Sequence, residues 1–382
     1  SVNRSDSILG QRNKLIDNLR GICMLGVIAI HAGSSIAVSA SPNVHIYMLF
    51  EVLSRYSVPA FFFISGYGLF ASYNLYQKLD YIPYLQKRLK SVGLPYVVWS
   101  VLYLLYYQFV TPGSVSWSPF ELFFTLFFGL ASYHIYFMVI LLWFYLLFPC
   151  WRMLLKVMQK TSIPLSLAVL FFLQLGINYW TCHYWAYPAW IAENTFFINM
   201  LNYRLNYLPF HYLFVFMMGA LAATHYEGFL HILRSHFRLV TAFFTLTVVL
   251  MSSRFYYLLN VKHLDLESIT NTLQQLSPEG FLYTVASLLF FSAILFKAEK
   301  ENLFLKANEL LSDNSYIIYL IHPFLLDQVV ALLARLFRTQ DDIPAFLTYF
   351  SVLILSLISS ILIKKAGKIL PVISLLLTGK SR

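Results

Sequence analysis

Ten apolar stretches, each long enough to cross a lipid bilayer as a helix, run through this chain of 382 residues. An α-helix rises about 1.5 Å per residue, so a hydrocarbon core of about 30 Å needs roughly 20 apolar residues. Lipid offers no hydrogen bonds to the backbone, so each crossing must be helical. The sequence therefore predicts an all-α polytopic membrane protein with about ten transmembrane helices. The predicted spans are residues 17–38, 46–71, 92–110, 133–150, 163–180, 209–225, 239–257, 280–297, 314–334 and 345–363.

The composition supports this class and limits what else the chain can contain. Hydrophobic residues make up 59% of the chain and charged residues 12%, and the mean hydropathy is +0.66. Because spans and short loops use up the length, we expect one transmembrane domain over residues 1–370 and a cytoplasmic tail at 371–382. The cysteines Cys23, Cys150 and Cys182 have neither disulfide-framework nor metal-ligand spacing, and we expect no metal site.

The distribution of the basic residues predicts the orientation. The net charge is +10, and 21 of the 27 lysine and arginine residues fall on one side of the predicted spans. Five fall on the other side, and Arg55 lies within a span. Such a bias marks the cytoplasmic side and places both termini there. The basic excess is thus explained by topology and by contact with the lipid bilayer, and we expect no nucleic-acid partner.

One further apolar segment, residues 119–131, is too short to span. Treating it as a span would also place every later loop on the side that its charge disfavours. We therefore expect a re-entrant or interfacial helix near residues 119–131.

The first predicted span carries Arg20 and His31, eleven residues apart. Eleven residues are about three helical turns plus 20°, so both side chains share one face, roughly 16 Å apart along the axis. Arg20 then lies at a membrane surface and His31 near the bilayer centre, where an ionisable group marks a functional site by default. Such a cation can hold an anionic cofactor, and such an imidazole can act as a base. Asp17 can orient the guanidinium of Arg20, or simply favour the helix N-terminus.

The second predicted span carries Glu51 and Arg55, four residues apart and expected to pair within the hydrocarbon. The pair either only fixes packing, or leaves Arg55 to polarise a carbonyl or hold an anionic group. Pro59 is expected to kink this span. Ser65 and Gly66 near its end allow close backbone approach.

The ninth predicted span carries a polar stripe of Ser315, Tyr319 and His322. Counted from the cytoplasmic side, His322 reaches about the depth of His31. Pro323 follows and is expected to free a backbone carbonyl there. The stripe belongs either to the wall of a site or to helix packing.

Two further groups complete the candidates. Lys87, Arg88 and Lys90 form a basic run before the third span; the run is either positive-inside charge or a phosphate contact. Tyr133 and His134 open the fourth span at its outer end. Such a pair most commonly lies at the membrane interface, and the alternative interpretation is that it contacts the substrate.

The ordered set of these motifs resembles the membrane acyltransferase 3 family, which includes O-antigen and capsule O-acetyltransferases. Arg20 and His31 look like its signature of an arginine and a histidine separated by ten residues. The other similar segments follow in the expected order: Arg55…Val58-Pro59…Phe63-Ile64-Ser65-Gly66-Tyr67, Lys87-Arg88…Leu94-Pro95-Tyr96, Tyr133-His134…Tyr136-Phe137, and Ser315-Tyr316…Ile318-Tyr319-Leu320-Ile321-His322.

The resemblance implies a ten-span enzyme of the bacterial cytoplasmic membrane that takes an acyl group, usually acetyl, from cytoplasmic acetyl-CoA. It implies a hydroxyl of an extracytoplasmic saccharide as acceptor. Arg20 would contact CoA phosphate and His31 would be the catalytic histidine. We expect Arg55, Tyr319 and His322 as further catalytic residues, with Arg55 or Tyr319 as the donor that stabilises the developing oxyanion. Asp17, Ser65, Lys87, Arg88 and Lys90 are candidates on the donor side, and Glu51, Tyr133 and His134 on the acceptor side.

The resemblance leaves several points open. We expect no soluble esterase-like domain of the kind that some relatives carry, and some members are linked to polysaccharide export. A polysaccharide or small-molecule exporter is thus the alternative function, because midplane ionisable residues also suit a transport pathway. Whether several copies of the chain assemble is likewise left open.

Overall fold

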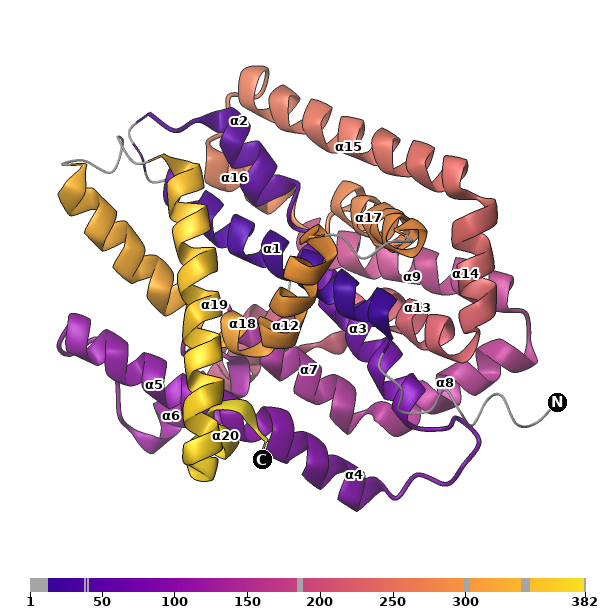
Figure 1. Ribbon diagram of the computed structural model, residues 1–382, viewed down its shortest axis with the longest axis horizontal. Helices are drawn as coiled ribbons and strands as arrows, with labels where there is room; N and C mark the ends of the chain where they lie inside the picture. Colours follow the sequence, from indigo (N-terminus) through magenta and orange to yellow (C-terminus); the bar gives the residue numbers. More distant parts are fainter. Residues whose placement is uncertain are drawn as a thin grey trace. The chain divides into compact units, whose positions relative to one another are not determined.

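The computed structural model describes residues 13–37, 39, 41–183, 188–298, 303–337 and 344–380, and within them every regular element is helical (Figure 1). The helices fall into two compact units, which are described separately. Unit 1 comprises Ser1–Leu75, Leu167–Cys182 and Phe214–Ser360. Unit 2 comprises Tyr76–Ser166, His183–Leu213 and Ile361–Arg382.

The described residues contain eight helical segments long and apolar enough to cross a membrane, or up to ten if each of two bent pairs counts as one span. This confirms an all-α polytopic membrane protein. Six of the eight are single helices and two are interrupted. They are α1 (Lys14–Ala37), α9 (Ile163–His183), α15 (Phe237–Asn260), α17 (Pro278–Lys297), α18 (Leu303–Leu336), α19 (Ala345–Ile369), Val44–Ser72 and Tyr81–Val110.

Both interrupted spans contain a π-helical turn. Val44–Ser72 consists of α2 (Val44–Tyr47), η1 (Met48–Val52) and α3 (Ser57–Ser72), and Tyr81–Val110 of α4 (Tyr81–Arg88), η2 (Leu89–Gly93) and α5 (Leu94–Val110). The regular helix of this span is interrupted about one turn before Pro59, in the turn at residues 53–56, and α3 continues through Pro59 itself. Pro59 belongs to the first turn of α3, where a missing N–H costs no helical hydrogen bond.

The bent pairs correspond to two spans that the sequence predicts as single helices. Residues 133–150 are divided between α7 (Tyr136–Leu146) and α8 (Phe148–Lys160), which meet at 65°. The second pair is Pro209–Thr224, made of η3 (Pro209–Tyr212) and α13 (Leu213–Thr224), followed at 103° by α14 (Tyr226–Ser235). The prediction of one continuous helix over residues 133–150 is therefore wrong, whereas the second bend falls at the predicted end of the span 209–225.

The bend between α7 and α8 has a local cause. Pro149 lies in the first turn of α8 and has no N–H for the carbonyl of Tyr145. The hydroxyl of Tyr84 donates to that carbonyl at 3.0 Å, and the hydroxyl of Tyr81 donates to the carbonyl of Leu146 at 2.8 Å. Side chains of α4 thus satisfy the backbone groups that the bend releases, as a low-dielectric interior requires.

The remaining elements are short. The predicted extra helix near 119–131 is α6 (Pro119–Phe128), which begins after the capping side chain of Ser118 and ends at Gly129 with φ +66°. Its 10 residues are too few to cross a bilayer. The others are α10 (Ala189–Ala192), α11 (Thr195–Asn202), α12 (Arg204–Tyr207), α16 (Leu266–Thr272) and α20 (Pro371–Thr378).

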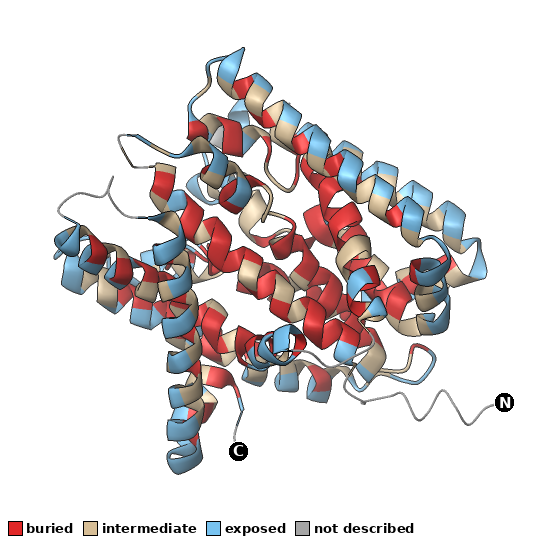
Figure 2. Ribbon diagram, turned by 45° about the horizontal axis from the view of Figure 1, so that its top comes forward, coloured by how far each residue is buried: buried red, intermediate tan, exposed pale blue. Residues whose placement is uncertain are grey.

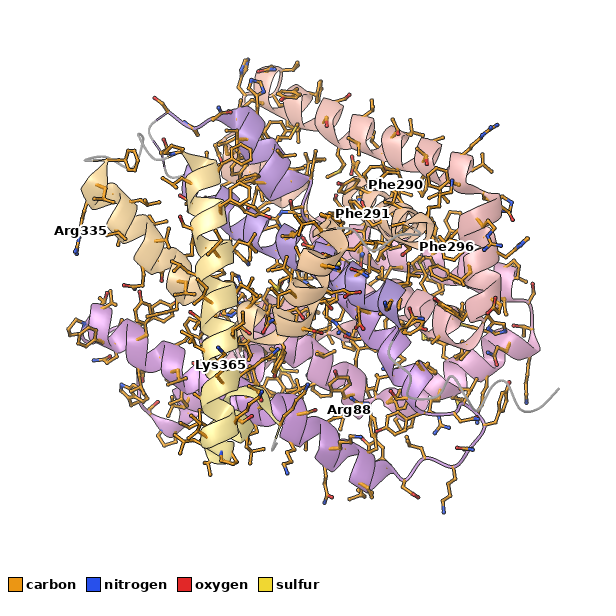
Figure 3. The ribbon with its side chains drawn as sticks, viewed as in Figure 1. Arg88, Phe290, Phe291, Phe296, Arg335 and Lys365 are labelled. Carbon is orange, nitrogen blue, oxygen red and sulfur yellow. The ribbon has the colours of Figure 1, made fainter. Side chains whose placement is uncertain are left out.

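Unit 1 is built around α1, which is buried along most of its length and packs along α18 (Figure 2). Helix α3 meets α13 at Gly66, where an added Cβ would lie 2.2 Å from the carbonyl oxygen of Phe216. This contact agrees with the close approach expected at Ser65 and Gly66. Helix α15 lies outside and joins α17 through aromatic rings: Phe290, labelled in Figure 3, stacks on Phe244 with ring centres 4.1 Å apart.

Candidate functional site

Helix α1 carries both residues of the most informative sequence motif. It runs without interruption from Lys14 to Ala37, so Arg20 and His31 lie on one face of one helix, as predicted. Their separation along the axis is about 16 Å at the normal helical rise. A single rigid element therefore connects a cation near its N-terminal end with an imidazole further along.

His31 has a second histidine as its neighbour. The ring of His322, on α18, lies with its centre 5.0 Å from that of His31, and the ring planes are tilted by 32°. His322 is completely buried, and the ring of Tyr319 lies 6.1 Å from it. The structure thus brings together the residues that the sequence placed at similar depths on two different spans.

The orientation of His322 follows from the proline after it. A helical N–H at position 323 would bond to the carbonyl of Tyr319, but Pro323 has no N–H. Nδ1 of His322 lies 2.8 Å from that carbonyl oxygen and 3.1 Å from the carbonyl oxygen of Ile318. The carbonyl that the sequence predicts to be free therefore holds the imidazole.

Glu51 and Arg55 form the expected ion pair within unit 1. Nη2 of Arg55 bonds to Oε1 of Glu51, and the two side chains are only 20% and 6% exposed. Nη1 of Arg55 donates to Oε1 of Gln275 at 3.3 Å. The sequence interpretation missed Gln275, which lies in the loop between α16 and α17. Its only sequence signal is a polar Gln274-Gln275 pair before the helix start at Ser277-Pro278.

This ion pair belongs to the surroundings of His31. At Gly33, two residues beyond His31, an added Cβ would lie 3.0 Å from Cβ of Phe50 and 3.1 Å from the backbone nitrogen of Glu51. Glycine thus lets η1 approach α1 closely. Arg55 and His322 both interact electrostatically with His31. His31, Glu51, Arg55, Tyr319 and His322 therefore form one cluster, which joins the catalytic candidates to Glu51.

The N-terminal end of α1 is more open. Nη1 of Arg20 lies 3.1 Å from Oδ1 of Asp17, and the two side chains are 35% and 10% exposed. On another side of the helix, Nδ2 of Asn308 donates to the backbone carbonyl of Asn18 at 2.6 Å. An anchored helix end with an accessible guanidinium is suited to binding an anion.

A cavity of about 260 Å³ lies at the same end of α1. Apolar and charged side chains line it, among them Leu15, Phe296, Lys14, Lys306 and Glu309. By helical geometry, Lys14 and Asn18 face roughly the opposite direction to Arg20 on α1. This cavity is thus separate from the face that leads to His31.

Ser65 belongs to unit 1 but makes a local contact. Its hydroxyl donates to the carbonyl of Phe61 at 2.8 Å, within α3. This bond explains how a serine is accommodated in a membrane helix. Its role on the donor side stays a prediction.

The other five candidates lie in unit 2. Lys87 and Lys90 are exposed, on α4 and η2. The guanidinium of Arg88 lies over the rings of Tyr84 and Tyr145, at 5.7 and 5.4 Å from their centres. The whole run lies within the helical segment Tyr81–Val110. Its contact with phosphate stays a prediction.

Tyr133 and His134 precede α7 in a turn, so they do not open a helix as expected. Tyr133 is exposed, whereas His134 is buried with Nδ1 3.2 Å from Oγ of Ser132. The ring of Tyr103 lies edge-on to His134, with centres 5.3 Å apart. This packing explains the burial of His134, and a substrate contact by either residue stays a prediction.

The comparison with protein families shows the family of the chain. A family model described as an acyltransferase domain matches residues 13–365, which is nearly the whole chain. The chain belongs to this acyltransferase family. A search of curated proteins and a search of solved structures found no match. Within the described residues, no group of three or more His, Cys, Asp or Glu side chains is arranged to hold a metal ion.

An acyltransferase must deprotonate an acceptor and stabilise the negative charge that develops on the acyl carbonyl oxygen. The cluster offers both kinds of group. His31 and His322 are imidazoles, and a neutral imidazole has one nitrogen that can accept a proton, while Arg55 is a fixed cation. The cluster can therefore serve acyl transfer with the chain's own side chains.

Proposed function

We propose that this membrane acyltransferase transfers an acyl group, in the first instance acetyl, from acyl-CoA to a hydroxyl of an extracytoplasmic glycan or its precursor. The observation that carries the proposal is the position of the two histidines beside the Glu51–Arg55 pair. His31 lies on the helix whose other end presents Arg20. The proposal includes the bacterial cytoplasmic membrane as location, with both termini cytoplasmic, because the charge bias favours that orientation.

The donor is proposed to enter at the Arg20 end. The guanidinium is accessible, and Asp17 holds it within the first turns of α1. It would bind a phosphate of CoA through paired, charge-assisted hydrogen bonds. The pantetheine arm would then follow the face of α1 toward His31, over a distance of about 16 Å.

The reaction is proposed to proceed at the histidine cluster. An imidazole takes the proton of the acceptor hydroxyl while its oxygen forms a C–O bond to the thioester carbonyl. Arg55 and the Tyr319 hydroxyl are the candidate donors to the oxyanion. The C–S bond then breaks, and the imidazolium returns its proton to the leaving thiolate, which gives free CoA. The products are an O-acyl ester and a thiol, and the base ends in its original form.

The test is reconstitution in liposomes, with acetyl-CoA labelled in the acetyl group supplied on the side of the C-terminus. A panel of soluble oligosaccharides is enclosed on the other side. We expect label to enter an oligosaccharide with release of one thiol per ester formed. His31→Ala should abolish both while the variant still binds CoA.

Two results would contradict the proposal. Undiminished transfer by His31→Ala would remove the catalytic assignment. Movement of an oligosaccharide across the membrane without thiol release would instead indicate the transport function, which midplane ionisable residues also suit.

A further inference from the structure

We propose that the cavity at the Lys14 end of α1 is a binding site for one anionic phospholipid. Its phosphate lies between Lys14 and Lys306, and the beginning of its acyl chains lies against the apolar wall. The inference goes beyond acyl transfer, because this cavity is separate from the face of α1 that leads to His31. The ligand is thus a component of the membrane and not a substrate.

The position of the cavity fits the phosphate of a lipid. Its lining comes from the beginning of α1, the end of α17 and the beginning of α18, all in unit 1. Phe296, labelled in Figure 3, is part of this lining. Each of the three helices is long and apolar enough to cross the membrane, so these ends lie at a membrane surface. Phospholipids carry their phosphates at the same level.

The charged side chains of the cavity favour an anion. Lys14 and Lys306 come from different helices and outnumber the carboxylate of Glu309 in the described lining. A third cation is close, because the guanidinium of Arg234 lies over the ring of Phe296, 5.2 Å from its centre. Basic pockets between membrane helices bind the headgroups of anionic lipids. Glu309 can accept a hydrogen bond from a headgroup hydroxyl, so a phosphate that carries a glycerol headgroup matches this set.

The rest of the wall is suited to the apolar part of a lipid. Leu15, Leu295 and Leu305 line the cavity and are buried. Apolar groups gain free energy when they leave water for such a wall. The volume is about 260 Å³, and one water occupies about 30 Å³ in the liquid, so roughly nine heavy atoms fit. This is about the size of a glycerophosphate, and the acyl chains must therefore continue outside the cavity.

The surface beside Lys306 indicates a lipid and not a soluble phosphate. Leu303 and Leu310 lie three residues before and four residues after Lys306, on the same face of α18. They are 85% and 44% exposed. Acyl chains that extend from a phosphate at Lys306 can cover these two leucines. A soluble phosphate would leave both of them uncovered.

The test is native mass spectrometry of the full-length protein in detergent, titrated with phosphatidylglycerol or with phosphatidylcholine. We expect one phosphatidylglycerol molecule to bind roughly 10- to 30-fold more tightly than phosphatidylcholine, since each lysine adds to the attraction for an anionic lipid. The double variant Lys14→Gln with Lys306→Gln should lose this preference. The matched control is Lys262→Gln with Lys368→Gln, two exposed lysines outside the cavity, and it should keep the preference.

Three results would overturn the inference. They are equal affinity of the wild-type protein for both lipids, an unchanged preference in the cavity variant, and an equal loss in the control variant. Glycerol 3-phosphate carries the phosphate without acyl chains, so its displacement of the lipid at equal concentration would indicate a soluble ligand and contradict the lipid site. Both cavity lysines are exposed, and without added lipid the variant should melt at the wild-type temperature. A loss of preference then reports the site and not the fold.

Discussion

The two ends of helix α1 hold their ionisable side chains in different ways. Near the N-terminal end, Arg20 is 35% exposed and has Asp17, one turn away, as its ion-pair partner. Further along, His31 lies among side chains from α18, η1 and the turn before α3. One group is thus held locally by its own helix, and the other by several elements.

The difference shows which kind of task each end can perform. An exposed guanidinium keeps much of its freedom, so it can bind an incoming anion at low cost in desolvation. Groups held by several neighbouring elements cannot reorganise easily, which favours a preorganised reaction centre. The Arg20 end of α1 should therefore control affinity for the donor. The His31 end should control the chemical step and the stability of the protein.

The largest effect is expected at His31. His31→Ala should lower kcat by roughly 10²–10⁴-fold, because it removes the base. Acetyl-CoA binding, measured by calorimetry, should persist. His45→Ala is the matched control, since His45 is exposed and bonds to Tyr256 at 2.6 Å outside the cluster. A comparable loss of kcat in His45→Ala would show that the assay reports folding and not catalysis.

The next effect is on stability, at Glu51. Glu51→Leu leaves the Arg55 guanidinium without its buried carboxylate, which should destabilise the protein by about 3–5 kcal/mol. Thermal unfolding in detergent measures the change. The double variant Glu51→Leu with Arg55→Met should unfold at a higher temperature than Glu51→Leu alone, because no buried charge is left without a partner. Equal melting temperatures would count against the buried ion pair.

Substitution at Arg20 should separate affinity from stability. Arg20→Ala should raise KM for acetyl-CoA about 10- to 100-fold, the size of a lost charge-assisted hydrogen bond. The melting temperature should hardly change, since an exposed ion pair contributes at most about 1 kcal/mol. Arg254→Ala is the control: Arg254 forms a comparable exposed pair with Glu279 at 3.8 Å. An unchanged KM in Arg20→Ala would remove the donor site from this end of α1.

A smaller effect is expected at Gln275. Gln275→Leu removes one of the hydrogen bonds that hold the Arg55 guanidinium, so kcat should fall about 10-fold with little change in KM. Gln274→Leu is the matched control, because Nε2 of Gln274 contacts the sulfur of Cys182 at 3.7 Å instead. Steady-state kinetics of the two variants decide whether the orientation of Arg55 matters for the chemical step.

The smallest expected effect concerns pH and lies outside the spans. Asp265 caps α16, and hydrogen bonds from the backbone N–H and hydroxyl of Ser268 lower the pKa of its carboxyl. A lowered pKa in the folded protein means that this stabilisation is present above the ordinary pKa of an aspartate. It is lost as the pH falls through the folded value. Asp265→Asn keeps the cap and removes the titrating carboxyl. The variant should therefore lose less stability than the wild-type protein as the pH falls, which is measured by unfolding from pH 5 downward. If Asp265→Asn and the wild-type protein lose stability equally as the pH falls, the Asp265 cap is not the source of this pH dependence.

Much of the fold was predictable because membrane helices are specified locally. The apolar runs predicted the spans, and the missing N–H of Pro323 predicted a released carbonyl. The bend between α7 and α8 was not predicted. Pro149 breaks a span only because Tyr81 and Tyr84, from another helix, satisfy the carbonyls of the bend, and hydropathy does not show such partners.

The sequence by itself determined that Arg20 and His31 share a face and that Glu51 and Arg55 pair, because helical periodicity fixes the positions of residues on the same helix. Only the tertiary structure decided that His322 lies 5.0 Å from His31 and that Gln275 contacts Arg55. Those contacts join residues 291 and 220 positions apart along the chain. They depend on how α1, α18 and the loop before α17 pack, which no local pattern encodes.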